Sequence, residues 1–194
     1  MSTALFDRNA IDATNIVDYI ADVFERRGAE AYLGEEVSMA QHMLQAAQEA
    51  EISHADPDLI VAALLHDIGH FSNEISDKLL MEGTNNYHAE AGANFLADYF
   101  PPSVTEPIRQ HVAAKRYLCA TDPQYLSRLS GASVYTLKVQ GGPMNPDEVA
   151  EFEKSPYLDN CIRVRVWDDA GKDPDKSHPD FSHYRDLVQS LVQR

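Results

Sequence analysis

The chain has 194 residues, of which 44% are hydrophobic, so it is long enough for one domain (residues 1–194) with its own apolar core. It carries 31 acidic against 16 basic residues, a formal net charge of −15, which disfavours nucleic acid as a partner because phosphate binding needs clustered Lys and Arg. Two cysteines are too few for a disulfide framework, and there is no apolar leader or membrane-spanning run. We therefore expect a cytoplasmic protein without a membrane partner.

The first half of the chain predicts helices almost throughout. Apolar residues recur from Ile16 to Phe24 at the i, i+3, i+4 spacing of an amphipathic helix, and Gly28 marks its expected end. Asp56 and Pro57 have the residue types of an N-cap and a first helical position, so a helix is expected from there to His66. The other elements expected in this half are helices over about 36–52 and 87–99 and a polar, irregular stretch over 71–86.

The second half predicts further helices, with two stretches that also resemble strands. Thr105 is expected to open a helix that holds His111 and Lys115. Residues 133–139 and 162–166 are rich in β-branched side chains, but neither alternates over enough residues to predict a sheet. The other expected elements are a short helix after Pro123, a break at Gly141-Gly142, a helix opening at Asn145, a helix over 158–169, a loop over 170–180 and a last helix containing Tyr184 to Leu191.

The pair His66-Asp67 is the most informative feature of the sequence. Five apolar residues, Val61 to Leu65, lead into it, so the pair is expected at the buried end of a helix. A carboxylate is costly to bury unless something neutralises it. Imidazole and carboxylate together suit a divalent transition metal. The pair therefore predicts a metal centre in the core.

Other residues in or beside predicted helices could complete such a centre. The ligands expected for one metal are His42, His66, Asp67 and Asp168. His88 and His111 are then left over, and they fit a second metal that shares the Asp67 carboxylate as a bridge. Taken alone, each of the separate candidates is more often a surface or ordinary core residue, so His66-Asp67 carries most of the weight.

The order His, His-Asp, Asp resembles the HD-domain superfamily, and the two extra histidines resemble its dinuclear branch. Nearly the whole chain is also similar to a narrower group, the phosphonate-cleaving mixed-valent diiron oxygenases. The segments that carry this resemblance are Tyr32-Leu-Gly-Glu35, His66-Asp-Ile-Gly-His70, His111-Val-Ala-Ala-Lys-Arg-Tyr-Leu118, Gln140-Gly-Gly-Pro-Met144 and Arg165-Val-Trp-Asp168.

The resemblance implies an all-α fold, a single HD-domain helical bundle with a dinuclear metal site in its core. It implies an Fe(II)/Fe(III) pair that uses O2 to cleave the C–P bond of a small organophosphonate. The iron ligands that it implies are His42, His66, Asp67, His88, His111 and Asp168, with Asp67 as the bridge. The phosphonate-holding groups that it implies are His70, Lys115, Ser133 and Arg165. Tyr32 and Glu35 are implied to be a mobile pair that covers an iron before substrate arrives.

The residues support this interpretation independently. Three pairs at helical spacing each set a ligand beside an anion-binding group: His66 with His70, His111 with Lys115, and Asp168 with Arg165. The first pair shares a helix face only if the helix continues through Gly69. Such pairs would form the positive pocket that a phosphonate needs in an acidic chain.

Two substrates fit this interpretation, 1-hydroxy-2-aminoethylphosphonate and its trimethylammonium counterpart, which would give phosphate with glycine or with glycine betaine. A primary ammonium favours an acceptor such as Glu35. A trimethylammonium favours aromatic faces, for which Tyr32 and Tyr87 are candidates, and we expect this second substrate.

The main alternative is an HD-domain metal-dependent phosphohydrolase, which would use the same first set of ligands. It does not explain the segment around Lys115 or the pair Tyr32 and Glu35. A diiron oxygenase acting on a polyol and a non-catalytic binding module also fit the His, His-Asp, Asp order.

Overall fold

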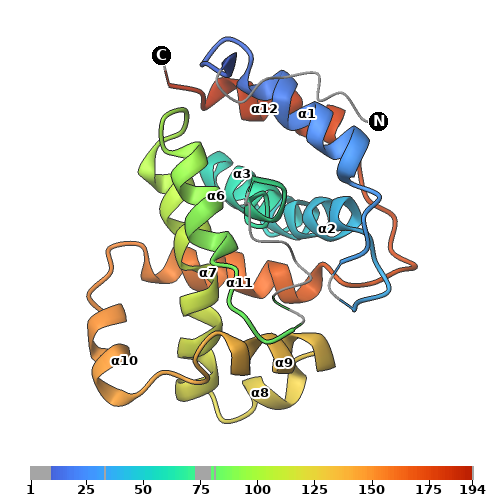
Figure 1. Ribbon diagram of the computed structural model, residues 1–194. Helices are drawn as coiled ribbons and strands as arrows, with labels where there is room; N and C mark the ends of the chain where they lie inside the picture. Colours follow the sequence, from blue (N-terminus) through green and yellow to red (C-terminus); the bar gives the residue numbers. More distant parts are fainter. Residues whose placement is uncertain (1–9, 33, 73–79, 81, 194) are drawn as a thin grey trace.

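The computed structural model describes residues 10–32, 34–72, 80 and 82–193. In this part of the chain the secondary structure is helical, with a single isolated β-bridge between Ala31 and Ser38, so the predicted all-α fold is confirmed. The central helices are α2 (Met39–Ile52), α3 (Pro57–Leu65), α4 (Gly69–Ser72), α6 (His88–Leu96), α7 (Pro102–Thr121) and α11 (Leu158–Ala170). Figure 1 shows α1 (Ile16–Arg27) and α12 (Phe181–Ser190) together at one end, and α8 (Tyr125–Arg128), α9 (Gly131–Val139) and α10 (Pro146–Phe152) at the other.

Both stretches that resembled strands are helical, one in α9 and one in α11. Each helix buries one side against neighbours: Ser133 and Thr136 of α9 are buried, as are Val164 and Arg165 of α11. A short run of β-branched residues therefore did not decide the local structure, because tertiary packing overrides weak β propensity.

Two helix starts follow from capping boxes, one of which the sequence analysis missed. Ser38 caps α2 through a capping box with Gln41, so this helix begins three residues later than predicted. Asn145 caps α10 with Glu148 as expected. Gly28 ends α1, but its φ of −60° is ordinary, and its small size matters because a Cβ there would lie 2.6 Å from that of Ala40.

The helix with His111 begins earlier than predicted. Pro101 is its N-cap and Pro102 its first residue, so the two prolines that close the preceding segment also open α7. Pro107 lies within the second turn of α7 rather than at its start. Helix α7 packs against α6, α3 and α11, which places it at the centre of the bundle.

The helix before His66-Asp67 does not continue through Gly69, contrary to the condition on which the pairing of His66 with His70 rested. Helix α3 ends at Leu65, a turn follows, and α4 begins at Gly69. A Cβ on Gly69 would lie 1.9 Å from the carbonyl oxygen of His88, so only glycine lets α4 cross α6 this closely. The crossing brings His70 next to His88 through tertiary packing and not through one helix face.

The main apolar cluster fills the space between α1, α12, α3, α2 and α6. A second, smaller cluster lies under α10 around Phe152 and Cys161. Between the main cluster and α9 lies a group of buried polar side chains, and this group forms the candidate site described below. No helix in the described residues combines the length and apolar character needed to cross a bilayer. Residues 73–79 and 81, part of the stretch expected to be irregular, lie outside the described residues.

Candidate metal centre and cavity

The six side chains expected to bind metal meet in the interior of the molecule, each at most 5% exposed. They come from five parts of the fold: α2, the end of α3, α6, α7 and α11. These residues are His42, His66, Asp67, His88, His111 and Asp168. Two groups of side chains lie close enough to hold an ion: one joins His42, His66 and Asp168, and the other joins Asp67 and His88 with His70, which is not one of the six.

One set gathers on the Oδ2 side of Asp67. The Nε2 atoms of His42 and His66 are 2.9 Å apart, and each lies 3.5 Å from Asp67 Oδ2. Asp168 Oδ1 is 3.5 Å from the Nε2 of His42. Four potential donor groups thus surround one point in space.

The other set gathers on the Oδ1 side of the same carboxylate. The Nε2 atoms of His88 and His111 are 3.2 Å apart, and they lie 3.4 and 3.5 Å from Asp67 Oδ1. The two oxygens of Asp67 therefore face two different histidine pairs, which is the arrangement of a bridging carboxylate.

All four of these histidines are oriented by a hydrogen bond at the opposite ring nitrogen. The acceptors of the Nδ1 hydrogens are the carbonyl oxygens of Gly171 (2.9 Å, from His42), Ala63 (2.8 Å, from His66) and Ile108 (2.7 Å, from His111), and Asn86 Oδ1 (2.9 Å, from His88). With the proton on Nδ1, the Nε2 lone pairs point at one another and at Asp67.

This arrangement fits metal ions. Two lone pairs facing each other at 2.9 or 3.2 Å repel unless a cation lies between them. Two ligand atoms about 2.1 Å from one ion and at right angles are about 3.0 Å apart, close to both spacings. Asp168 Oδ1 is buried and accepts no hydrogen bond from the described part of the chain, although Lys172 Nζ lies 3.5 Å away.

Burial and neighbouring charges keep these side chains in the protonation states that can bind a cation. Burial lowers the pKa of His66 and His88 below the ordinary value, and it lowers the pKa of His111 to about 4. Burial alone would raise the pKa of Asp168, but the charges of Arg165 and Lys172 hold it well below its usual range. The imidazoles are therefore neutral and the carboxylate is ionised at neutral pH.

A cavity lies beside Asp67 and is lined by His88, His111 and residues of α9. The four residues expected to hold a phosphonate all line it: His70, Lys115, Ser133 and Arg165. Helix α7 carries both His111 and Lys115, as their spacing predicts. Lys115 Nζ donates to Thr136 Oγ1 at 3.0 Å, and burial and the nearby Arg165 lower the pKa of Lys115 to about 7.

Arg165 forms most of its polar contacts with carboxylates. Its Nη1 donates to Asp168 Oδ2 at 2.6 Å, its Nη2 pairs with Asp169, and its Nε donates to the hydroxyl of Tyr125 at 2.9 Å. The charged side chains that line the cavity in the described residues are Glu35, Asp67, Asp168, Lys115, Arg165 and Lys172. Three acids and three bases balance, so these side chains alone do not make the cavity the positive pocket that was expected.

Lys172, just after α11, is a cavity residue that the sequence analysis missed. Its Nζ donates to Ser133 Oγ at 2.9 Å and lies 5.9 Å from the centre of the Tyr32 ring. It follows Asp168 by four residues, the spacing used to find the other pairs. Lys172 lies in a stretch that was expected to be a loop, where helical spacing does not predict that two side chains are close.

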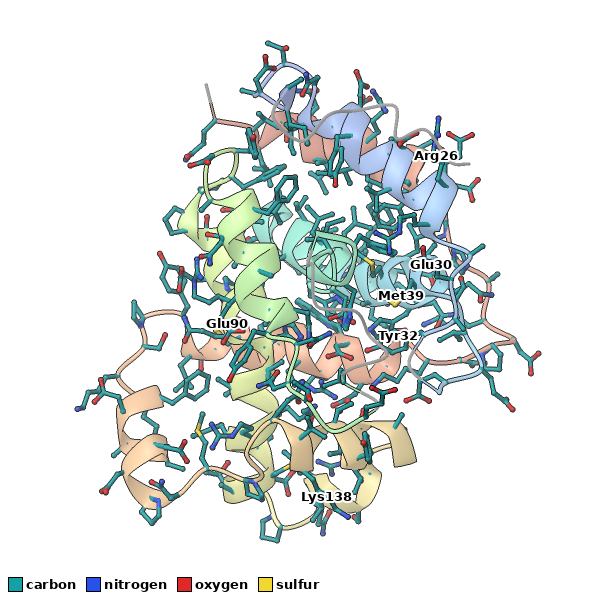
Figure 2. The ribbon with its side chains drawn as sticks, viewed as in Figure 1. Arg26, Glu30, Tyr32, Met39, Glu90 and Lys138 are labelled. Carbon is teal, nitrogen blue, oxygen red and sulfur yellow. The ribbon has the colours of Figure 1, made fainter. Side chains whose placement is uncertain are left out.

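Tyr32 and Glu35 lie in the loop between α1 and α2, where Figure 2 labels Tyr32. The Tyr32 ring stacks on His42, with centroids 4.0 Å apart, and Glu35 accepts a hydrogen bond from Ser130. Both side chains line the cavity. Tyr87, the second aromatic candidate, is 58% exposed and lines a separate surface pocket, so it is not a face of this cavity.

The model of the HD-domain family matches residues 39–168, from the first residue of α2 to Asp168. The chain belongs to the HD-domain family. The matched part of the HD domain holds all six residues that are expected to bind metal, whereas Tyr32, Glu35 and Lys172 lie outside it.

Comparison with individual proteins identifies relatives of this chain within the family. The HD-domain chain is 50% identical to [1-hydroxy-2-(trimethylamino)ethyl]phosphonate dioxygenase (glycine-betaine-forming) of Leisingera caerulea, over 97% of this chain and 96% of the relative. It is 41% identical to hydroxymethylphosphonate dioxygenase of Gimesia maris, over 84% and 82% of the two chains. An uncharacterised protein of Acanthamoeba polyphaga mimivirus is 33% identical over 96% and 86%. The resemblance to the phosphonate-cleaving HD-domain oxygenases is thereby confirmed.

Proposed function

We propose that this protein is a dioxygenase that uses O2 to cleave the C–P bond of [1-hydroxy-2-(trimethylammonio)ethyl]phosphonate, giving phosphate and glycine betaine. The observation that carries the proposal is the pair of histidine sets on opposite oxygens of Asp67, beside a cavity lined by Lys115 and Ser133. The 50% identity to a relative named for this reaction supports the choice of substrate.

We propose iron as the metal, in an Fe(II)/Fe(III) pair. His42, His66, Asp67 and Asp168 would hold one ion, and His88, His111 and Asp67 the other. The donors are imidazole and carboxylate without a thiolate, a set that suits iron. The iron pair supplies the redox chemistry with O2, and the protein supplies ligation, orientation and charge.

The protein ligands suggest where the substrate binds. The set around His88 offers three protein ligands against four around His42, so it leaves more positions for substrate. His70 and Lys115 lie on this side: the His70 ring stacks on His88, and Lys115 follows His111 by one helical turn. We therefore propose that the phosphonate end of the substrate lies against α7 and α9.

The residues of the cavity would hold the phosphonate by directed donors. Lys115 donates one of its three hydrogens to Thr136, which leaves the others for phosphonate oxygens. Because Lys172 donates to Ser133 Oγ, the Ser133 hydroxyl hydrogen is free to donate to the substrate. Because Arg165 donates to Asp168, we propose that Arg165 mainly fixes this carboxylate and contributes less to anion binding than Lys115 does.

The reaction balances without an added reductant. The carbon that bears the hydroxyl group becomes a carboxylate, a four-electron oxidation, and one O2 accepts four electrons while both of its atoms enter the products. One O2 therefore yields one phosphate and one glycine betaine, and one proton is released. A hydrolase acting in this site would consume no O2.

At the other end of the substrate, the trimethylammonium has no N–H donor and favours aromatic and negatively charged surroundings. Tyr32 offers an aromatic face, and Glu35 is a carboxylate of the cavity that is not an expected metal ligand. We propose that these two side chains move on substrate binding, so that the Tyr32 ring and the Glu35 carboxylate come to face the cation.

The test is turnover by iron-loaded protein of three 1-hydroxyphosphonates that carry trimethylammoniomethyl, aminomethyl or hydrogen on the hydroxyl-bearing carbon. We expect phosphate and glycine betaine from the first in equal amounts, with the highest kcat/KM, and no product without O2. Phosphate release that persists without O2 from a phosphate ester would instead support the phosphohydrolase. If kcat/KM were highest with hydroxymethylphosphonate, the preferred substrate would instead be the one for which the Gimesia maris relative is named.

A further inference from the structure

Asn86 is a fully buried amide whose two ends contact two different imidazoles. It lies two residues before His88, in the segment that leads into α6. Its Oδ1 is 2.9 Å from His88 Nδ1, and its Nδ2 is 3.4 Å from His70 Nδ1. The two rings are stacked, with centroids 4.1 Å apart and planes 19° apart.

The chemistry of the amide gives the two rings opposite tautomers. An amide oxygen can only accept, so His88 must carry its hydrogen on Nδ1, and its Nε2 is a lone-pair donor. The amide nitrogen can only donate, so Nδ1 of His70 is the acceptor and the hydrogen of that neutral ring is on Nε2. Asn86 thus prepares one ring to bind a metal and its stacked neighbour to donate a hydrogen bond.

Distance alone does not separate these two roles. His70 Nε2 lies 3.8 Å from Asp67 Oδ1, and Asp67, His70 and His88 together could hold an ion. His70 could therefore be taken for a ligand of the second metal. The ring nitrogen that faces the site carries a hydrogen in His70, and a protonated nitrogen cannot ligate a metal.

We infer that Asn86 is a positioning residue that fixes His88 as a metal ligand and His70 as a hydrogen-bond donor to the anionic group of the substrate. The part of this inference that concerns the metal depends only on the geometry of His88. The half that concerns the phosphonate rests on the proposed function, so its test uses inorganic phosphate, a product that can bind without turnover.

The metal half is tested by the metal content of purified, iron-loaded variants. Asn86→Asp keeps an acceptor for His88, and we expect two metals per chain. Asn86→Leu has a similar volume but no acceptor, and we expect an affinity for the second metal about 10- to 100-fold lower, with the first metal retained. Asn85→Asp is the matched control, because it adds the same charge one residue away and keeps the acceptor for Tyr87 N. Two tightly bound metals in Asn86→Leu would overturn this half.

The anion half is tested by calorimetric titration of the same iron-loaded proteins with inorganic phosphate. Asn86→Asp lacks the amide hydrogens, so the His70 hydrogen shifts to Nδ1, and we expect phosphate to bind about tenfold more weakly. His70→Phe keeps the stacked ring without a donor, and we expect the same loss with both metals retained. In the His70→Phe background, Asn86→Asp should weaken phosphate binding no more than Asn85→Asp does in the wild type, because both substitutions add one negative charge.

Several outcomes would overturn the anion half. Loss of a metal in His70→Phe would show that His70 is a ligand. Unchanged phosphate affinity in Asn86→Asp, or additive losses in the double variant, would show that Asn86 does not act through His70. Neither readout requires turnover, so failure of the proposed reaction is seen separately, as wild-type protein that binds metals and phosphate but forms no glycine betaine.

Discussion

Lys172 Nζ donates a hydrogen bond to Ser133 Oγ at 2.9 Å, and the ammonium group also lies 3.5 Å from Asp168 Oδ1. One side chain thus joins the expected phosphonate-holding hydroxyl to an expected metal ligand. Its side chain is 11% exposed, so little water screens these contacts.

The first prediction concerns this contact. Lys172→Met should raise KM for the phosphonate about tenfold, because it removes a charge-assisted donor and leaves Ser133 without its orienting partner. Lys172→Arg should recover part of the loss. Lys138→Met is the control and should behave as wild type, since Lys138 is exposed at the outer edge of α9 (Figure 2). Steady-state kinetics measures the effect, and an unchanged KM in Lys172→Met would contradict it.

The second prediction is a pH dependence set by Lys115, whose pKa is about 7 in the free protein. The phosphonate favours the charged ammonium, so binding takes up protons when Lys115 is partly neutral. KM should therefore rise as pH increases above 7, by up to about tenfold per pH unit. Lys115→Arg keeps its charge throughout this range, and its KM should stay flat between pH 7 and 8.5. Equal slopes in both proteins would show that another group titrates.

The third prediction tests Asp67 as a bridge. Asp67→Ala should lose both metals, because each oxygen of this carboxylate faces a different histidine pair. Asp168→Ala should lose mainly the metal held by His42 and His66. Metal analysis after purification and iron loading measures both, with circular dichroism to confirm folding. If Asp67→Ala retained two metals per chain, the carboxylate would not be the shared ligand.

The fourth prediction concerns Gly171, whose carbonyl oxygen accepts the hydrogen bond from His42 Nδ1. A Cβ at this position would lie 2.8 Å from the carbonyl oxygen of His42 and 3.1 Å from Ala46 N. Gly171→Ala should therefore lower the free energy of unfolding by about 1–3 kcal/mol and weaken binding of the metal near His42.

Gly131→Ala is the matched control for this substitution, because a Cβ on Gly131 meets no atom within 4 Å. The free energy of unfolding of Gly131→Ala should stay within about 1 kcal/mol of wild type, because alanine has a higher helix propensity than glycine and meets no neighbour here. Chemical denaturation of the two proteins, with metal analysis, measures the difference. Equal stability and equal metal content would show that α2 and α11 can move apart without cost.

Much of the site could be predicted from the sequence because its residues carry local signals. The apolar run into His66-Asp67 predicted burial, and helical spacing placed Lys115 beside His111. Spacing failed for His70, which reaches the site because α4 crosses α6 at Gly69. It also failed for Tyr87, since adjacency to His88 does not show where a side chain points.

The sequence by itself determined the helical fold and the types of donor atom, because hydrophobic periodicity and ligand chemistry are properties of a few neighbouring residues. The tertiary structure alone decided which oxygen of Asp67 faces which histidine pair, that Lys172 meets Ser133, and that Asn86 lies between His70 and His88. The physical reason is that hydrogen bonds and metal sites need atoms within about 3 Å, and packing of separate helices sets such distances.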